Sequence, residues 1–331
     1  MLSPVCESDF FMELTLATRI LTLFLIGGVG YWLQHRGAMG KDGRDAIVRV
    51  VMLVFFPCMS FHSMATKIDP DAVMVNVTVA GLSFAMIVFG ALLGYAAVRP
   101  TGLTGGSRST FIHMCACNNY VFMPLPIVHF LWPAQDGIIF LVMLGAGIAY
   151  WTAGVYPLVQ GHHPLHQLKN LMNLPFLSTV AGLVVAMMGW TRYFQDGNSV
   201  LNAFFQAAEL LGTPTAPCAI LLVGAGLANA TASVSARTMV WYSAVRLVIF
   251  PVLFLPFLAF SGLSMLDIQV LLLVAMTPAS NTSTLIAQRF GGDPQLASSA
   301  NLYSTLLSGV TIPLLHPQLL RLTEWMGALL T

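Results

Sequence analysis

The sequence predicts an all-α integral membrane protein of about ten transmembrane helices, built as two inverted five-helix repeats with broken crossover helices. Three observations support this fold class. The chain is too apolar to fold in water, its long apolar runs are separated by short polar connections, and helix breaks recur at matching places in its two halves.

Charged side chains are scarce along the whole chain. Of its 331 residues, 57% are hydrophobic and 8% are charged, with 14 basic and 13 acidic side chains. A soluble domain contains about 25% charged residues, so this protein must present much of its surface to a lipid bilayer. The net charge of +1 gives no reason to expect nucleic acid as a partner.

Ten apolar runs are long enough to cross the hydrocarbon core, which requires about 20 residues per helix. They are 14–34, 46–66, 73–98, 109–132 and 137–159 in the first half, and 174–191, 200–228, 237–260, 267–289 and 298–320 in the second. No basic region or cleavage site precedes the first run, so we expect it to remain as a span. The longest polar connection, 161–170, predicts a first repeat over 1–160 and a second over 161–331.

Basic residues gather on one side of these spans. The odd-numbered connections and their flanks contain nine of the 14: Arg36, Lys41, Arg44, Arg49, Arg99, Arg108, Lys169, Arg237 and Arg289. The even-numbered connections and the termini contain three, Lys67, Arg192 and Arg321, and the other two, Arg19 and Arg246, lie within spans. Because cytoplasmic loops retain an excess of Lys and Arg, both termini are predicted to lie outside. Five spans per half then invert the second repeat relative to the first.

Four spans are interrupted by helix-breaking residues. Pro57 interrupts the second span, and Pro214 with Pro217 interrupts the seventh. The fourth and ninth spans contain mixed clusters of proline and polar residues: Asn118, Asn119, Tyr120, Pro124 and Pro126 in the fourth, and Pro278, Ser280, Asn281, Thr282 and Ser283 in the ninth. The second span thus corresponds to the seventh and the fourth to the ninth, as an inverted five-plus-five repeat requires.

These breaks have a structural and a functional interpretation. A proline in a helix removes a donor and frees a carbonyl, and in hydrocarbon such groups need protein or cavity water as partners. For Pro57 or Pro251 alone, a simple kink is the better interpretation. For the fourth and ninth spans, the clustering favours a binding site, where donors and half-helix N-termini attract an anion and carbonyls attract a cation.

Ionisable residues within spans are costly and therefore suggest function. Glu209 is the carboxylate placed well within a span, where it either carries a coupling proton or pairs near a helix start. Arg246, about two turns into the eighth span, either attracts an anionic substrate or neutralises Glu209. His113 is the third candidate, although an intramembrane histidine is more often a packing residue. The few carboxylates argue against a dedicated sodium site, although backbone carbonyls also supply oxygen ligands.

Neither a metal nor another cofactor is expected. Cys115 and Cys117 are separated by one residue, which is not the spacing of common zinc sites, and no second pair accompanies them. An intramembrane enzyme would require a recognisable catalytic pair within the spans, and the sequence offers none. We therefore expect a protein that is not an enzyme.

At its breaks the chain resembles the auxin efflux carrier, or membrane transport protein, family, which includes plant auxin exporters and bacterial dicarboxylate permeases. The residues that fit the family's motifs are Asn119, Pro126 and Ile127 in the fourth span, Arg246 and Pro251 in the eighth, Pro278, Ala287 and Phe290 in the ninth, and Pro313 in the tenth. Two positions differ: Pro124 stands where glycine is usual, and Ser283 replaces the second crossover proline of the plant exporters. The resemblance extends over essentially the whole chain.

The resemblance implies a scaffold domain and a transport domain, each formed from both repeats, with the substrate bound where the broken helices cross. It also implies N- and C-termini outside the plasma (inner) membrane and an elevator-like, alternating-access movement of an organic anion. We therefore expect a secondary active transporter of a small carboxylate. The long cytoplasmic loop of the plant exporters is missing, which argues against auxin as the substrate. The coupling ion, proton or sodium, and the choice between monomer and homodimer stay open.

Two other functions are compatible with the sequence. One is a sodium-coupled organic-anion symporter of the bile-acid type, a family with a related ten-helix layout. The other is a membrane receptor or sensor that does not transport, which a soluble signalling domain would favour; the sequence contains none.

Overall fold

The computed structural model describes residues 4–159, 164–197, 199–228, 234–280 and 282–328. In the first half the α-helices are α1 (Pro4–His35), α2 (Gly40–Val50), α3 (Phe56–Lys67), α4 (Val73–Ala97), α5 (Gly105–Ala116), α6 (Pro124–Leu131) and α7 (Asp136–Ala149). In the second half they are α8 (Leu174–Met187), α9 (Thr191–Gln195), α10 (Val200–Gly212), α11 (Thr215–Ala228), α12 (Ala236–Ala244), α13 (Phe250–Ala259), α14 (Met265–Ala275), α15 (Ser283–Arg289) and α16 (Pro294–Ala328). Over these ranges no β-strand forms, so the predicted all-helical class is confirmed.

Short helices of other types complete the fold. Three 3₁₀ segments, η2 (Arg99–Thr101), η3 (Pro133–Gln135) and η5 (Pro164–Leu171), lie in connections. The π-helical turns η1 (Val51–Phe55) and η6 (Val245–Ile249) lie inside long helices, and η4 (Tyr150–Gly154) ends the helix that contains α7. Pro57 and Pro251 each follow such a turn by two residues, where the wider turn accommodates a ring that does not fit a regular α-helix.

Polar residues set the starts of several helices after their connections. The side chains of Asn173, Ser199 and Ser264 accept hydrogen bonds from the first turns of α8, α10 and α14. Such N-caps satisfy backbone donors that a helix leaves unpaired at its start. They place the helix boundaries close to the predicted limits of the spans.

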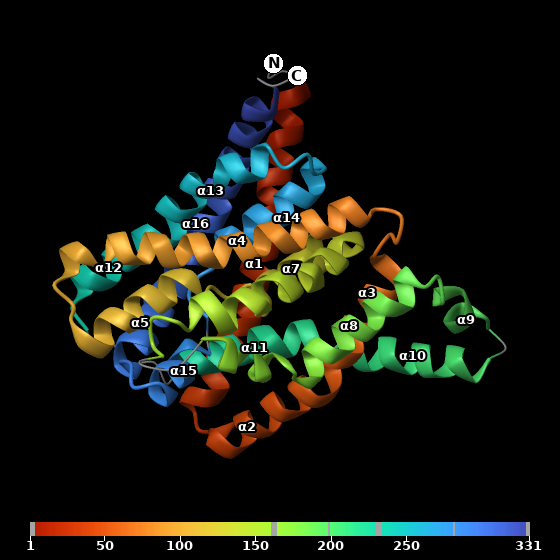
Figure 1. Ribbon diagram of the computed structural model, residues 1–331, viewed down its shortest axis with the longest axis horizontal. Helices are drawn as coiled ribbons and strands as arrows, with labels where there is room; N and C mark the ends of the chain where they lie inside the picture. Colours follow the sequence, from red (N-terminus) through yellow and green to blue (C-terminus); the bar gives the residue numbers. More distant parts are fainter. Residues whose placement is uncertain (1–3, 160–163, 198, 229–233, 281, 329–331) are drawn as a thin grey trace.

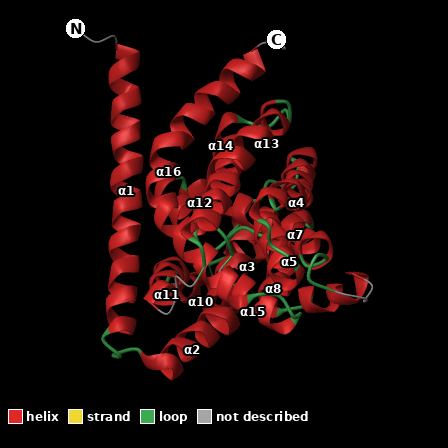
Figure 2. Ribbon diagram, turned by 90° about the vertical axis from the view of Figure 1, so that its left-hand side faces the viewer, coloured by secondary structure: helices red, strands yellow, loops and turns green. Residues whose placement is uncertain are grey.

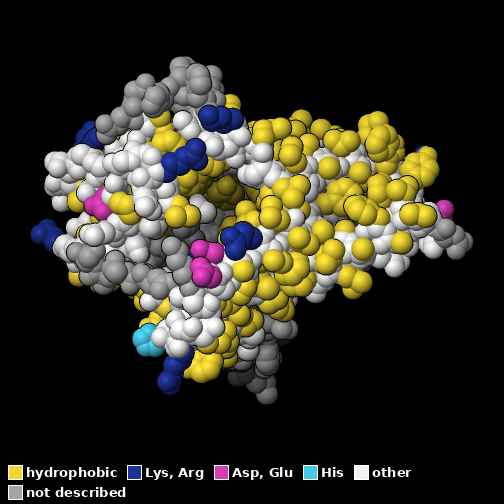
Figure 3. Space-filling model, turned by 90° about the horizontal axis from the view of Figure 1, so that it is seen from below, with side chains coloured by type: hydrophobic (Ala, Val, Ile, Leu, Met, Phe, Trp, Pro, Cys, Tyr) yellow, Lys and Arg dark blue, Asp and Glu magenta, His cyan; other side chains and the backbone are white. Residues whose placement is uncertain are grey.

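Within the part of the chain that the structure describes, five helical segments are long and apolar enough to cross a membrane: Asp42–Lys67, Val73–Ala97, Pro133–Gly154, Val200–Ala228 and Ala236–Ala259. They expose many large apolar side chains, and Met74 and Val200, for example, are 77% and 88% exposed. Figure 3 shows a broad apolar surface on one face, with charged side chains confined mainly to one side and to the rim of a hollow. A surface of this kind is suited to lipid rather than water.

The helices pack in two groups. In the first, α1 lies along α11, and α3 packs against α8 and α10. In the second, α4 packs against α5 and α7, and α16 packs against α12, α13 and α15. The beginning of α1 and the end of α16 lie at the same end of the molecule in both views (Figures 1 and 2).

Glycines allow the closest helix contacts within each group. A Cβ atom at Gly224 of α11 would overlap the carbonyl oxygen of Gly27 in α1, and one at Gly145 of α7 would overlap that of Ala80 in α4. Backbones that approach this closely exclude any larger residue, which is a common device of helix packing in membranes. Gly226, two residues beyond Gly224, has open space around it.

Candidate functional site

The breaks of the fourth and ninth spans meet in the structure. Asn118 and Ala279 form an isolated antiparallel β-bridge. The backbone N–H of Asn119 donates to the carbonyl oxygen of Pro278 at 2.8 Å, and that of Ser280 donates to Cys117 at 3.1 Å. These bonds satisfy backbone groups that the ends of α5 and α14 leave unpaired, as burial in hydrocarbon requires. Two segments from opposite halves of the chain therefore cross as extended backbone.

Asn118 fastens this crossing. Its side-chain Nδ2 donates to the carbonyl oxygen of Val274 at 2.7 Å and lies 2.8 Å from Oγ1 of Thr277. Val274 belongs to the last turn of α14, and its carbonyl oxygen also accepts from the backbone N–H of Thr277 at 3.1 Å and from Oγ1 of Thr277 at 2.7 Å. The Asn118 amide is thus committed to holding the ninth span against the fourth.

Asn119 has a different environment. It lines a cavity of about 320 Å³ beside the crossing and is 4% exposed. None of the hydrogen bonds found among the described residues involves its side-chain amide, whereas its backbone N–H is bonded to Pro278. The amide is therefore available to a ligand in the cavity.

Hydroxyl groups line the same cavity. The Tyr150 hydroxyl lies 3.1 Å from Oγ1 of Thr282, which lies 2.8 Å from Oγ of Ser280. Each hydroxyl can both donate and accept a hydrogen bond, so these three hydroxyl groups can direct donors toward an oxygen atom of a bound ligand. The polar lining is completed by Asn118, Tyr120 and Asn173. It offers hydrogen-bond donors without a lining carboxylate, which suits an anion.

Of the other residues predicted for this site, the described ones do not line the cavity. Pro124 and Pro126 occupy the first turn of α6, where their missing N–H groups would lack helical partners in any case. Pro278 contributes only its carbonyl oxygen to the crossing, and Ser283 is buried at the start of α15. Asn281 lies outside the described residues.

The suggested pairing of Glu209 with Arg246 is wrong. Glu209 lies on α10, its side chain is 61% exposed, and Oε2 lies 3.8 Å from Nε2 of His62 on α3. Arg246 lies in η6 and donates from Nη1 to the carbonyl oxygen of Ala275 at 3.0 Å. The two groups are separated because α10 packs with α3 in one helix group, whereas the helix containing Arg246 packs with α16 in the other.

His113 lies near the crossing, at the end of α5. Its Nδ1 lies 2.8 Å from the carbonyl oxygen of Gly154, and its ring meets that of Tyr150 edge-on. This bond and the complete burial of the side chain favour the packing role that the sequence already suggested for histidines.

Sequence reasoning missed most of the cavity lining, including residues that come from irregular turns and a helix cap. Tyr150 and Trp151 come from the π-helical turn η4, Met52 comes from η1, and Asn173 is the N-cap of α8. π-Turns inside helices are frequent at functional sites, but their positions have no clear sequence signature. The one usable signal was the Tyr-Trp pair that follows the glycine-rich stretch of the fifth span.

An ion-pair cluster around the buried Asp136 lies at the opposite end of α7 from Tyr150. Oδ2 of Asp136 lies 2.6 Å from Nζ of Lys67 and 2.8 Å from Nδ1 of His129. Lys67 also donates to the carbonyl oxygen of Pro133 at 2.7 Å. Because Lys67 ends α3 and Asp136 begins α7, the cluster joins the two helix groups at that end.

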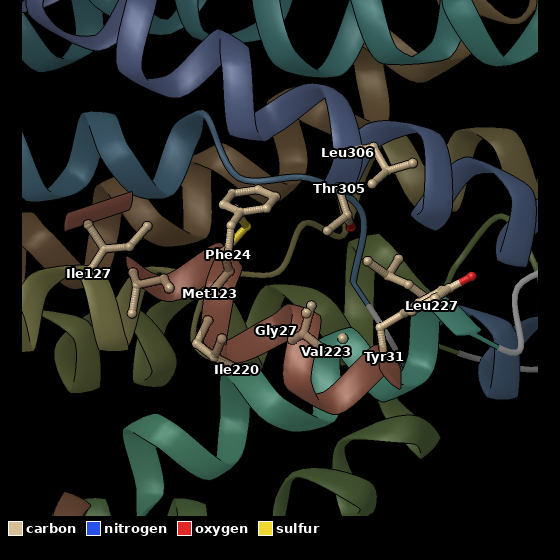
Figure 4. A pocket seen from close by; sticks show the side chains of 13 residues that line it. Phe24, Gly27, Tyr31, Met123, Ile127, Ile220, Val223, Leu227, Thr305 and Leu306 are labelled. Carbon is tan, nitrogen blue, oxygen red and sulfur yellow. The ribbon is translucent and has the colours of Figure 1, made fainter. Parts of the chain in front are cut away.

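A second cavity lies between the groups and is almost wholly apolar. It has a volume of about 200 Å³ and is bounded by α1, α11, α16 and the residues around the start of α6. Figure 4 shows Phe24, Ile220 and Leu306 among the side chains around it. It is lined by no charged side chain, and its only hydroxyl side chains are those of Tyr31 and Thr305, so it is poorly suited to a carboxylate.

Comparison with known families gives one match. A family model described as membrane transport protein matches residues 15–165 and 163–316. The matched ranges include both breaks, the cavity residues and the eighth span. No curated protein matches the chain significantly.

Proposed function

Because the chain belongs to the membrane transport protein family, the auxin efflux carrier-like transporters, we propose that this multi-pass membrane protein is a secondary active transporter of a small carboxylate. The observation that carries the proposal is the amide of Asn119, which has no hydrogen-bond partner among the described residues and lies beside the hydroxyl groups of Ser280, Thr282 and Tyr150. Donors aimed at one place with little competing water stabilise an anion strongly.

We further propose ten spans in two inverted repeats, with an elevator-like movement between the two helix groups. The group of α1, α3, α8, α10 and α11 would be the scaffold, and the group of α4 to α7 and α12 to α16 would be the transport domain. Supporting this division, the crossing and Arg246 belong entirely to the second group, and the apolar cavity of Figure 4 lies at the boundary. An apolar boundary between the two helix groups, with few hydrogen bonds across it, would allow one group to slide along the other.

Flux measurements in proteoliposomes test this function. Purified protein should take up labelled carboxylates from a panel of mono- and dicarboxylates, and unlabelled substrate inside the vesicles should accelerate uptake by exchange. Imposed proton and sodium gradients identify the coupling ion, and a strict sodium requirement would favour the bile-acid type of symporter. Binding without flux would favour a receptor, and neither binding nor flux from folded protein would refute the proposal.

Both termini are predicted to lie outside the cell, because nine basic residues flank the odd-numbered connections and three lie on the other side. An epitope tag at either end should react with antibody on intact cells. A tag in the connection 161–170 should react only after permeabilisation. Protected terminal tags would contradict the predicted orientation.

The cluster of Lys67, Asp136 and His129 should hold the outer end of the two groups closed. Asp136→Asn removes the charge that binds Lys67, so the outer end should open more often. Ile68 is 7% exposed and packs beside Gly137, next to the cluster. In a cysteine-free background, Ile68→Cys should react several-fold faster with an impermeant maleimide when Asp136→Asn is also present.

The matched control is Asp71→Asn. Asp71 is an exposed carboxylate in the connection between α3 and α4, like Ile68, but it lies outside the cluster. This substitution should leave the reaction rate of the introduced cysteine unchanged. Equal rates for both double variants would show that the ion pairs do not restrain the outer end.

A further inference from the structure

The eighth span donates hydrogen bonds to the ends of both broken helices at the crossing. The hydroxyl of Tyr242 donates to the carbonyl oxygen of Met114 at 3.0 Å, and Nη1 of Arg246 donates to that of Ala275 at 3.0 Å. Met114 lies in the last turn of α5, and Ala275 is the last residue of α14. Tyr242 and Arg246 are four residues apart, so they project from one side of the same helix.

Helix C-termini are electronegative. Their last carbonyls lack helical partners, and the aligned peptide dipoles place about half a negative charge at each such end. Where broken helices meet inside a membrane, these ends and the unwound carbonyls commonly coordinate a coupling cation. At the end of α14 in this protein, the guanidinium of Arg246, rather than a metal ion, contacts the carbonyl oxygen of Ala275.

Arg246 is buried in an unusual way for a charged residue. It is 1% exposed, its guanidinium carbon lies 4.3 Å from the centre of the Phe250 ring, and within the described ranges no carboxylate pairs with it. Its Nε is buried without a hydrogen-bond partner among the described residues. An uncompensated charge in hydrocarbon is expensive and generally reflects function. The end of α14 compensates for part of this charge, which leaves the crossing positive.

We propose that Arg246 is a built-in cation that takes the place of a coupling sodium ion, so that the crossing binds a carboxylate without sodium. The carboxylate part rests on the function proposed above. Arg246 does not line the cavity, so it is a positioning residue: it holds the end of α14 and supplies the positive field, while Asn119 and the hydroxyls contact the ligand.

The first test needs no substrate. The unfolding midpoint of the purified protein is measured in sodium chloride and in choline chloride at equal ionic strength. The parent protein and Arg246→Lys should show the same midpoint in both salts. Arg246→Met leaves the electronegative end of α14 without its cation, so its midpoint should be lower in choline and should rise in sodium. Tyr242→Phe removes the other donor without a change of charge, so it should lower the midpoint equally in both salts.

The second test measures binding of succinate, malate and acetate in the same two salts. The parent protein should bind its preferred carboxylate with equal affinity in both. Arg246→Met should bind it at least about tenfold more weakly in choline and recover part of the loss in sodium, and Arg246→Lys should stay within a few-fold of the parent.

Sodium-dependent stabilisation or binding of the parent protein would overturn the inference, as would an Arg246→Met variant that matches the parent in both salts. If that variant does not fold, Arg246→Gln and the parent protein decide the question by the same measurements. Failure of the parent protein to bind any carboxylate would refute the proposed substrate class. The sodium response of the unfolding midpoint would still test the role of Arg246 independently.

Discussion

Asn119→Ala is expected to weaken carboxylate binding by about 10-fold or more while the protein keeps its fold. A hydrogen bond to a charged group contributes about 1.5–3 kcal/mol, which corresponds to roughly 10- to 150-fold in affinity. The Asn119 amide makes no hydrogen bond to the described residues, and its backbone bond to Pro278 is available to alanine as well. Binding is measured by titration with labelled substrate, and folding by the unfolding midpoint.

Two further variants sharpen this test. Asn119→Asp keeps the shape but places a negative charge beside the anion, so it should lose more affinity than the alanine variant. Asn118→Ala removes the bonds to Val274 and Thr277 that fasten the crossing, so it should lower the unfolding midpoint as well as the affinity. Wild-type binding by both Asn119 variants would show that the cavity beside the crossing is not the substrate site.

Gly224→Leu is expected to abolish the packing of α1 against α11. Even a single methyl group at this position overlaps the carbonyl oxygen of Gly27, so a larger side chain must push the two helices apart. Overpacking of a tight contact costs about 1–3 kcal/mol, and the cost rises when the obstacle is backbone, which cannot rotate away. The amount of monodisperse protein in detergent and its unfolding midpoint should both fall sharply.

Gly226→Leu provides the matched control, because apart from the neighbouring backbone of its own helix no described atom lies within 4 Å of a Cβ placed at Gly226. The two glycines are on the same helix and differ by two positions, so helix propensity affects both variants equally. Equal loss of folded protein in the two variants would show that propensity, rather than close backbone contact, explains the effect.

The positions of the helices and of their breaks could be predicted from the sequence because both depend on local chemistry. Apolar length identifies a span, and proline beside polar residues identifies a break. The separate roles of Asn118 and Asn119 could not be predicted in this way. They are neighbours in sequence, and only the placement of α14 commits one amide to Val274 while the other borders the cavity.

The wrong pairing of Glu209 with Arg246 and the site residues missed in the sequence have one physical origin: they depend on contacts between distant segments. Glu209 and Arg246 looked like partners because they are opposite charges within spans, but α10 and η6 belong to different helix groups. From the sequence, Asp136 received no role because it falls between two predicted spans. In the structure its buried side chain contacts Lys67 and His129. Tyr150 and Met52 reach the cavity from π-helical turns. Such a turn rotates the following side chains around the helix axis, and the apolar pattern of the sequence does not show this rotation.

The crossing also determines when the site can form during synthesis. Its side-chain bonds join residues 156 and 159 positions apart, so they form only after the second half of the chain has entered the membrane. Until then, the break between α5 and α6 lacks the backbone partners that Pro278 and Ser280 provide. Contacts between residues so far apart are made late in folding, and groups that wait for them are exposed to mispairing. The crossing is thus among the contacts that form late in the folding of the protein.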